Sequence, residues 1–166
     1  NTSHTEHVPV AIVGGGPTGV TAATLLAQYG VDCLVLDRWP QVYPQPRAVH
    51  LDDEVYRILA RLGIAGEFAE ISRPAHGLRL IDRDMTVLAQ FDRDTRLTRH
   101  GFPAASMFDQ PQLEELLRAN LTRYPHARLR GDIEVLDLAV GSGAQPLRLT
   151  VRDRTTGEHS SVTADF

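Results

Sequence analysis

The stretch Val8–Arg38, which reads VPVAIVGGGPTGVTAATLLAQYGVDCLVLDR, decides the fold. In it an apolar run meets Gly14, Gly16 and Gly19 in the spacing G-x-G-x-x-G, and a small-residue helical pattern follows. A second apolar run then ends in Asp37. A strand, a glycine turn, a helix, a strand and a terminal acid in this order are typical of a dinucleotide-binding βαβ unit. The sequence therefore predicts a dinucleotide site at this turn.

Each of these residues has a physical reason to be there. Gly14 permits the tight turn, Gly16 lets the backbone approach a pyrophosphate, and Gly19 allows the helix to pack closely on the strand. The free N–H groups at the helix start then face the anion. Asp37 is placed to bind an adenosine ribose, which favours a free 2′-hydroxyl over a 2′-phosphate even with Arg38 beside it. The alternatives are a purely structural glycine turn and a solvated strand-end acid.

The composition is typical of a soluble globular protein, with 42% hydrophobic and 23% charged residues. A net charge of −4 gives no reason to expect nucleic acid or an acidic membrane as a partner. All 17 basic residues are arginine, so this chain holds neither a P-loop lysine nor a Schiff-base lysine.

The patterns of cysteine, histidine and hydropathy exclude further classes of protein. The single cysteine, Cys33, leaves no disulfide framework and is predicted to be a small buried hydrophobe. The seven histidines have no H-x-x-x-H or H-E-x-x-H spacing, so no metal site is predicted. No apolar run approaches the roughly 20 residues that span a bilayer, and the polar N-terminus lacks a signal-peptide core. We therefore expect a cytoplasmic protein.

Apolar periodicity predicts the first elements: a strand at about 8–13, a helix at about 17–29 and a strand at about 32–37. The proline-rich segment WPQVYPQPR that follows cannot be regular helix or central strand. It is placed to wrap over a ligand. A second helix opens with the acids at 52–54. The residues of its predicted buried stripe are Val55, Ile58, Leu59 and Leu62.

Later elements alternate between hairpins and one more helix. A β-hairpin is predicted at 77–91, and Asp109 with Gln112 resembles a capping box for a leucine-rich helix. Strands follow at 127–129 and 133–140, where a parity shift after Val135 indicates a bulge or burial on both faces. A last hairpin joins 147–152 to 160–166. The predicted fold class is α/β: a Rossmann-like FAD-binding βαβ start with inserted β-hairpins, and an incomplete FAD/NAD(P)-binding domain.

Four stretches carry a family resemblance: GGGPTG, LDR, PRAVHLDDE and FDQPQLEELL. They resemble the FAD-dependent aromatic hydroxylases, the class A flavoprotein monooxygenases, and most of all their 3-(3-hydroxyphenyl)propionate hydroxylase branch. The resemblance spans nearly the whole chain. The first motif is shared by many FAD proteins, whereas the PRAVHLDDE and FDQPQLEELL motifs are much more specific.

The resemblance implies the residues of a cofactor site. The glycine motif, with Pro17 and Thr18 inside it, holds the pyrophosphate; Asp37 binds the adenosine ribose, and Arg38 lies near the adenine. Arg47 reaches the pyrophosphate or the flavin edge, since an arginine suits a dianion. Gln110 hydrogen-bonds the ribityl chain, because an amide matches a polyol, and Val135 lines the adenine pocket.

Other interpretations of three residues stay open. Arg47 can be an ordinary loop arginine, and Gln110 can be only a helix-start residue. His50 can face the substrate cavity or serve the structure, so we assign it no catalytic role. We name no catalytic residue and no metal ligand in this chain.

For the protein as a whole, the resemblance implies hydroxylation of a small phenolic substrate with FAD as cofactor and NAD(P)H and O2 as co-substrates. The family's later Asp-Gly and Gly-Asp flavin motifs lie beyond Phe166. We therefore expect residues 1–166 to be the N-terminal part of an FAD-binding domain, with 76–92 as the first hairpin of a substrate-side sheet. Alone it should bind FAD weakly or not at all.

Two alternatives remain: another FAD-dependent oxidoreductase, or a non-catalytic dinucleotide-binding module. The sequence does not specify the phenol, the choice of NADH or NADPH, or the oligomeric state.

Overall fold

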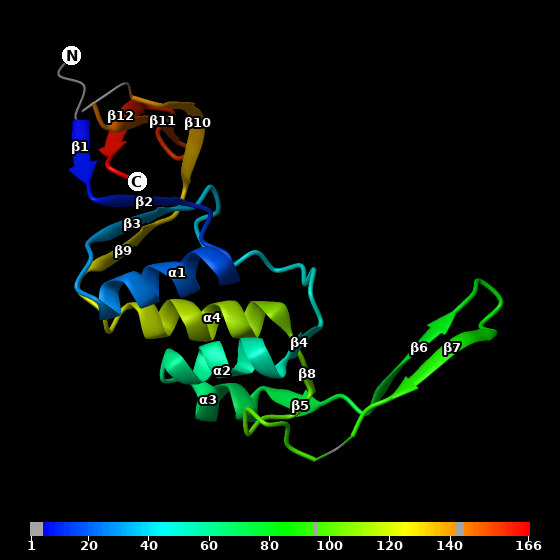
Figure 1. Cartoon of the computed structure of the whole chain (residues 1–166). Coiled ribbons are helices and arrows are strands. Elements are labelled where there is room, and N and C mark those ends of the chain that lie inside the picture. Colours follow the sequence, from blue (N-terminus) through cyan, green and yellow to red (C-terminus); the bar gives the residue numbers. More distant parts are fainter. Residues whose placement is uncertain (1–4, 95, 142–144) are drawn as a thin grey trace. The chain divides into compact units, whose positions relative to one another are not determined.

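The computed structural model describes residues 5–94, 96–141 and 145–166, and the chain divides into two compact units. The first unit combines Asn1–Tyr43 with Leu117–Phe166, and the second comprises Pro44–Leu116 (Figure 1). The division falls within helix α4 (Gln110–Leu121). Within the described ranges no helix is both long and apolar enough to cross a bilayer.

The first unit contains the predicted βαβ arrangement. Strands β2 (Val10–Val13), β3 (Cys33–Leu36) and β9 (Ala127–Arg130) form a parallel sheet in the order β2-β3-β9. Helix α1 (Pro17–Gln28) connects β2 to β3 and packs on this sheet through buried small residues, among them Ala23. The α/β fold class predicted from the sequence is confirmed.

A second sheet of this unit has the order β1-β12-β11-β10. Its strands are β1 (Thr5–Val8), β10 (Ile133–Ala139), β11 (Leu147–Asp153) and β12 (His159–Ala164). β1 runs parallel to β12, and the other neighbours are antiparallel. The register of β10 shifts between Val135 and Asp137, which confirms the predicted bulge.

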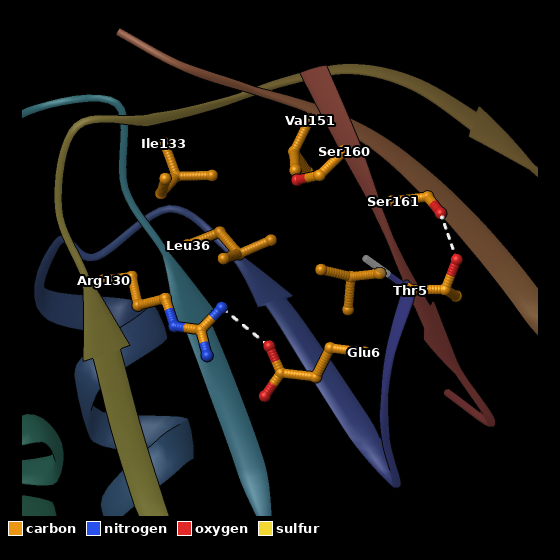
Figure 2. Close-up of a pocket in the computed structure, with 9 residues that line it drawn as sticks. Thr5, Glu6, Leu36, Arg130, Ile133, Val151, Ser160 and Ser161 are labelled. Atoms are coloured by element: carbon orange, nitrogen blue, oxygen red, sulfur yellow. Dashed lines mark hydrogen bonds and ion pairs between the residues drawn. The ribbon is translucent and has the colours of Figure 1, made fainter. Parts of the chain in front are cut away.

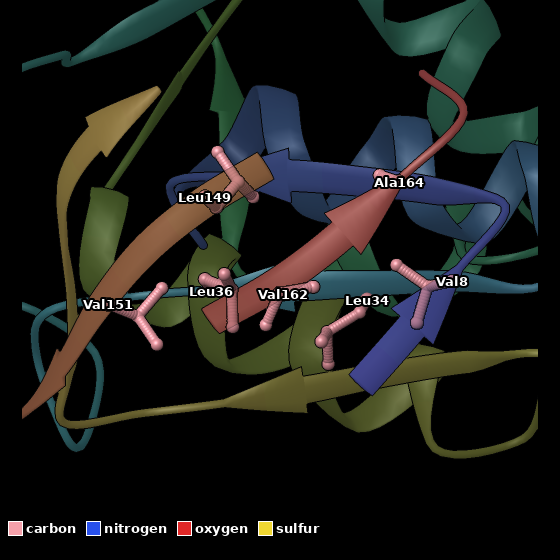
Figure 3. Packing of buried hydrophobic residues seen from close by; sticks show 7 residues of the cluster. All are labelled: Val8, Leu34, Leu36, Leu149, Val151, Val162 and Ala164. Atoms are coloured by element: carbon pink, nitrogen blue, oxygen red, sulfur yellow. The ribbon is translucent and has the colours of Figure 1, made fainter. Parts of the chain in front are cut away.

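The core of the first unit joins these two sheets. Leu34 and Leu36 of β3 meet apolar side chains of β1, β11 and β12 (Figure 3). On the other face of β3, the Cys33 Sγ lies 3.6 Å from the Ala23 carbonyl oxygen of α1. Because β3 is buried on both faces, its sequence is an uninterrupted apolar run instead of an alternating one. The buried members of the cluster are Val8, Leu34, Leu36, Leu149, Val151, Val162 and Ala164.

The second unit packs two helices and a small antiparallel sheet. The helices are α2 (Asp53–Arg61) and α3 (Ala65–Glu70). The sheet has the order β4-β8-β5, from β4 (His50–Asp52), β8 (Ala105–Phe108) and β5 (Ser72–Pro74).

An aromatic cluster corrects the predicted stripe of α2. Tyr56 is buried, its ring stacked on Phe102 at 4.4 Å and edge-on to Phe68 at 4.9 Å. Val55, which we expected in the stripe, is 40% exposed. The buried face of α2 therefore includes the tyrosine, because its ring finds aromatic partners that periodicity alone does not indicate.

A hairpin of β6 (Gly77–Ile81) and β7 (Val87–Asp92) completes the second unit and confirms the predicted turn near residues 83–84. The Asp82 carboxylate accepts hydrogen bonds from the backbone N–H groups of Asp84 and Thr86 and so fixes the turn.

Candidate functional site

The glycine turn has the geometry that its sequence predicts. Gly14 has φ +106°, a conformation that a side chain would strain. Helix α1 begins at Pro17, and Gly16 at its N-cap makes no side-chain capping bond. A Cβ built on Gly16 would meet no atom within 4 Å, whereas one on Gly19 would lie 2.0 Å from the Gly14 carbonyl oxygen. Gly19 therefore serves helix–strand packing, and Gly16 leaves open space at the start of the helix.

Asp37 lies directly after β3 and is only 7% exposed. Its backbone is held on both sides, since its N–H donates to the Arg130 carbonyl and its own carbonyl accepts from Ile133, each at 2.9 Å. Its Oδ1 accepts a hydrogen bond from the Trp39 N–H at 3.1 Å. The alternative of a solvated strand-end acid is therefore wrong.

Arg118 is a residue of this site that the sequence analysis missed. Its Nη2 donates to Asp37 Oδ2 at 2.7 Å and to the Gly15 carbonyl oxygen at 3.0 Å. It thus links the glycine turn to the acid. Its Nε is buried and has no hydrogen-bond partner within the described part of the chain. A signal was present in the sequence: Gln110, Glu114 and Arg118 recur every four residues beside the leucine stripe of α4.

Arg47 and Gln110 come together in the second unit. The Gln110 side-chain oxygen accepts hydrogen bonds from the backbone N–H groups of Arg47 at 2.7 Å and Ala48 at 2.8 Å. Its amide nitrogen donates to Glu114 at 2.7 Å, and both side chains are buried. Gln110 thus fixes the backbone of the PRA segment, which is more than a helix-start residue does. One N–H of its amide is free of these three bonds.

The surface around this pair is hollowed. A cavity of about 420 Å³ is lined by residues on either side of both motifs, among them Pro46, Val49, Asp109 and Gln112. The Arg47 side chain is exposed.

Three other residues singled out by sequence are placed as follows. The Arg38 guanidinium lies 5.1 Å from the centre of the Trp39 ring. Val135 on β10 is half-buried and packs against the core cluster. Cys33 is buried as predicted, and burial followed by the charge of Asp32 raises the pKa of its thiol. A protonated buried thiol is chemically inert.

A further cavity of about 460 Å³ lies in the first unit (Figure 2). Leu36, Ile133 and Val151 give it apolar walls, and Glu6 contacts Arg130 at its rim. Burial alone would raise the pKa of Glu6, but the hydrogen bonds and charges of Arg128 and Arg130 bring it below its ordinary value. Glu6 is therefore an ionised structural carboxylate.

The glycine turn and Asp37 fit a dinucleotide such as FAD. The uncapped first turn of α1 and the open space at Gly16 suit a pyrophosphate. The Asp37 carboxylate has about four acceptor positions, of which the two bonds from Trp39 and Arg118 occupy two. It retains acceptor capacity for a ribose hydroxyl.

Comparison with known families gives a match over residues 7–166 to a family described as FAD binding domain. The chain belongs to this family. The predicted resemblance is confirmed among its relatives as well. A 3-(3-hydroxy-phenyl)propionate/3-hydroxycinnamic acid hydroxylase from Burkholderia vietnamiensis is 36% identical over 95% of this chain. A probable NADH-specific resorcinol 4-hydroxylase from Rhodococcus jostii is 37% identical over 77% of it.

This FAD binding domain chain spans 28% of the length of the Burkholderia relative and 24% of the Rhodococcus relative. Among solved structures, it resembles the flavin-dependent monooxygenase PieE in complex with FAD and substrate, with a TM-score of 0.81 and 26% identity. That match covers 96% of this chain and 29% of PieE. The p-nitrophenol 4-monooxygenase PnpA of Pseudomonas putida shares the fold, with a TM-score of 0.83, 20% identity, and coverage of 97% of this chain and 40% of PnpA.

Proposed function

We propose that this chain is the N-terminal part of an FAD-dependent monooxygenase that hydroxylates a phenolic substrate with NAD(P)H and O2. The observation that carries the proposal is the combination of an uncapped α1 N-terminus, open space at Gly16 and a buried Asp37 that retains acceptor capacity. The named activities of the relatives support the hydroxylase reaction.

We assign cofactor-binding residues to each unit separately. In the first unit, the turn binds the pyrophosphate, Asp37 binds the adenosine ribose and Arg38 lies at the adenine side. Arg118 holds the Asp37 carboxylate in place. Val135 is proposed to line the adenine pocket. The residues of the pyrophosphate-binding turn are Gly14, Gly16, Pro17, Thr18 and Gly19.

In the second unit, Arg47 contributes positive charge to the cofactor, and the remaining N–H of Gln110 donates to the ribityl chain. The bonds that Gln110 accepts from the PRA backbone support this assignment, because a fixed backbone limits where Arg47 can reach. Mobility of that segment would cost binding free energy.

When bound, FAD would supply the chemistry that joins the reactants: NAD(P)H gives a hydride, the solvent gives a proton, and O2 gives one oxygen atom to the ring. The other oxygen atom leaves as water, and the substrate C–H becomes C–OH. This chain's residues would bind and orient the cofactor, and no acid–base role is assigned to them.

The β6-β7 hairpin is proposed to begin the substrate-side sheet. Leu78 pairs with Phe91 and Leu80 with Ala89, which places these side chains on one face. Leu78, Leu80 and Phe91 are about half exposed, at 47%, 47% and 55%. An apolar hairpin face of this kind is suited to packing against further strands and an aromatic substrate.

The full-length protein tests the function. We expect it to purify with a bound yellow flavin, and a phenol should speed its oxidation of NAD(P)H while ¹⁸O from ¹⁸O2 enters the product. Gly16→Ala should lower FAD occupancy, whereas Gly66→Ala, which also adds a methyl into open space, should not. A colourless protein that binds only NAD would refute the FAD assignment. A flavoprotein that releases only hydrogen peroxide would refute hydroxylation.

A further inference from the structure

The segment that follows Asp37 is held by a residue from the other end of the chain. Arg154, in the turn between β11 and β12, donates from Nη1 to the Arg38 carbonyl oxygen at 2.5 Å. Its guanidinium lies 5.1 Å from the centre of the Trp39 ring, on which the Arg38 guanidinium also lies at 5.1 Å. Trp39 therefore contacts two cations.

The backbone around Arg154 is fixed to the same strand ends. The Arg154 N–H donates to the Asp132 carbonyl oxygen at 2.8 Å. Ile133, which follows Asp132 in the chain, donates from its N–H to the Asp37 carbonyl oxygen. Gly131 lets the Trp39 carbonyl approach closely, since a Cβ there would lie 2.8 Å from that oxygen. The position of Arg154 is thus coupled to that of residues 37–39 by backbone contacts.

Trp39 in turn acts on the Asp37 carboxylate, because its N–H is the donor to Asp37 Oδ1. Any shift of Trp39 moves this donor and changes the orientation of the carboxylate. Within the described residues Arg154 has no carboxylate partner. Its side chain instead contacts the Arg38 carbonyl oxygen and the Trp39 ring.

We propose that Arg154 is a positioning residue for the adenosine half of the cofactor. It holds Trp39, and Trp39 orients the Asp37 carboxylate toward the ribose. The inference rests on the proposed function, because it assumes that Asp37 binds the adenosine ribose. It assigns a role in cofactor affinity to Arg154, which lies 117 positions after Asp37 in the sequence and outside every motif that the family resemblance uses.

The test compares three ligands that divide the cofactor into its halves. Full-length apoprotein is titrated with FAD, with ADP, which carries the adenosine ribose without the flavin, and with FMN, which carries the flavin without adenosine. Arg154→Met is the test variant. Arg152→Met is the matched control, because Arg152 lies two residues earlier, on β11, and pairs with Glu134 instead.

For Arg154→Met we expect the dissociation constants of FAD and ADP to rise by about fivefold, the value of one hydrogen bond of ordinary net strength. The constant for FMN should not change, and Arg152→Met should leave all three constants unchanged. Arg154→Lys, which keeps a cation able to reach the ring and the carbonyl, should restore most of the affinity. If Arg154→Met does not fold, Trp39→Leu should show the same selective loss.

Two results would overturn the positioning role. One is an equal loss of FMN and FAD affinity, which a general structural defect would produce. The other is an FAD affinity of Arg154→Met equal to that of the wild-type protein, provided that the wild-type protein binds FAD tightly. Failure of the wild-type protein to bind either flavin would instead refute the proposed function, and the inference with it.

Discussion

Gly19→Ala should destabilise the protein far more than Gly16→Ala, although both add one methyl group to the same turn. A Cβ at Gly19 would lie 2.0 Å from the Gly14 carbonyl oxygen and 3.2 Å from Ile12 Cγ2, whereas one at Gly16 meets nothing within 4 Å. Ordinary contact begins at 3.4 Å, so the Gly14 carbonyl and α1 must separate by about 1.4 Å. The nearer contact is with the backbone carbonyl of Gly14, which cannot rotate away as the end of a side chain could.

The cost of Gly19→Ala is about 3 kcal/mol, at the upper end for overpacking. For a chain of this size that lowers Tm by about 6–12 °C. Gly16→Ala loses only a modest N-cap preference, so its Tm should fall by about 2 °C or less. Its FAD affinity should nevertheless fall by about tenfold or more, or about 1.4 kcal/mol, because the methyl occupies the space proposed for the pyrophosphate.

Thermal unfolding followed by circular dichroism measures the first effect, and flavin fluorescence titration measures the second. If Gly19→Ala unfolds within 2 °C of the wild type, close helix–strand packing is not what requires this glycine. Equal loss of stability in both variants would refute the division of roles between the two glycines.

Three further substitutions test the ion pairs and the PRA segment. Glu6→Gln should lower the free energy of unfolding by about 1 kcal/mol at pH 7. Because folding lowers the pKa of Glu6, its ionised carboxylate stabilises the fold above the ordinary carboxyl pKa. This stabilisation is lost as the pH falls through the lowered value. Denaturation midpoints of the two proteins should therefore converge in acid, and a constant gap would contradict the ion pair. Arg118→Met leaves the buried Asp37 carboxylate without its cation and should lower the free energy of unfolding by about 3 kcal/mol. Adding Asp37→Asn should recover part of this loss in a double-mutant cycle. If the effects of the two substitutions simply add, the two side chains are not coupled. Gln110→Ala frees the Arg47 and Ala48 N–H groups and should cost about 2 kcal/mol. Hydrogen exchange at those two amides should quicken, with exposed Gln112→Ala as the unchanged control.

Local patterns in the sequence predicted the elements that depend on local contacts. The βαβ unit, the β6-β7 hairpin and the β10 bulge follow from periodicity and turn residues within short windows. The strand predicted over 8–13 is instead two strands, β1 and β2, that belong to different sheets. Pro9 separates them: it has no N–H for a ladder, and its carbonyl accepts from Asp165 and Phe166.

Long-range pairings were not predictable in the same way. β1 pairs with β12 between residues 156 positions apart, such as Thr5 and Ser161. Nothing in either strand's own sequence encodes the partner. The three-residue strands β4 and β5 are too short for an alternation pattern, and they exist because β8 lies between them.

The candidate site shows the same limit at the level of single residues. Sequence motifs indicated Asp37 and Gln110 because each lies in a recognisable pattern, but their partners come from elsewhere in the chain. The cation on Asp37 is Arg118, and the groups held by Gln110 are two backbone amides. A backbone donor carries no sequence signal at all, so only the folded chain reveals that Gln110 fixes the PRA segment.

Gly15 is a residue whose identity is explained by the folded chain and not by the sequence motif in which it lies. It is the variable position of the G-x-G-x-x-G pattern, and that pattern does not require a glycine there. In the fold, a Cβ at Gly15 would lie 2.6 Å from Asp37 Oδ2, and the Gly15 carbonyl accepts a hydrogen bond from the same Arg118 nitrogen that binds that oxygen. The turn after β2, the acid after β3 and the arginine of α4 therefore constrain one another. The second glycine of GGGPTG is explained by the position of Asp37, so it depends on that acid as much as on the turn in which it lies.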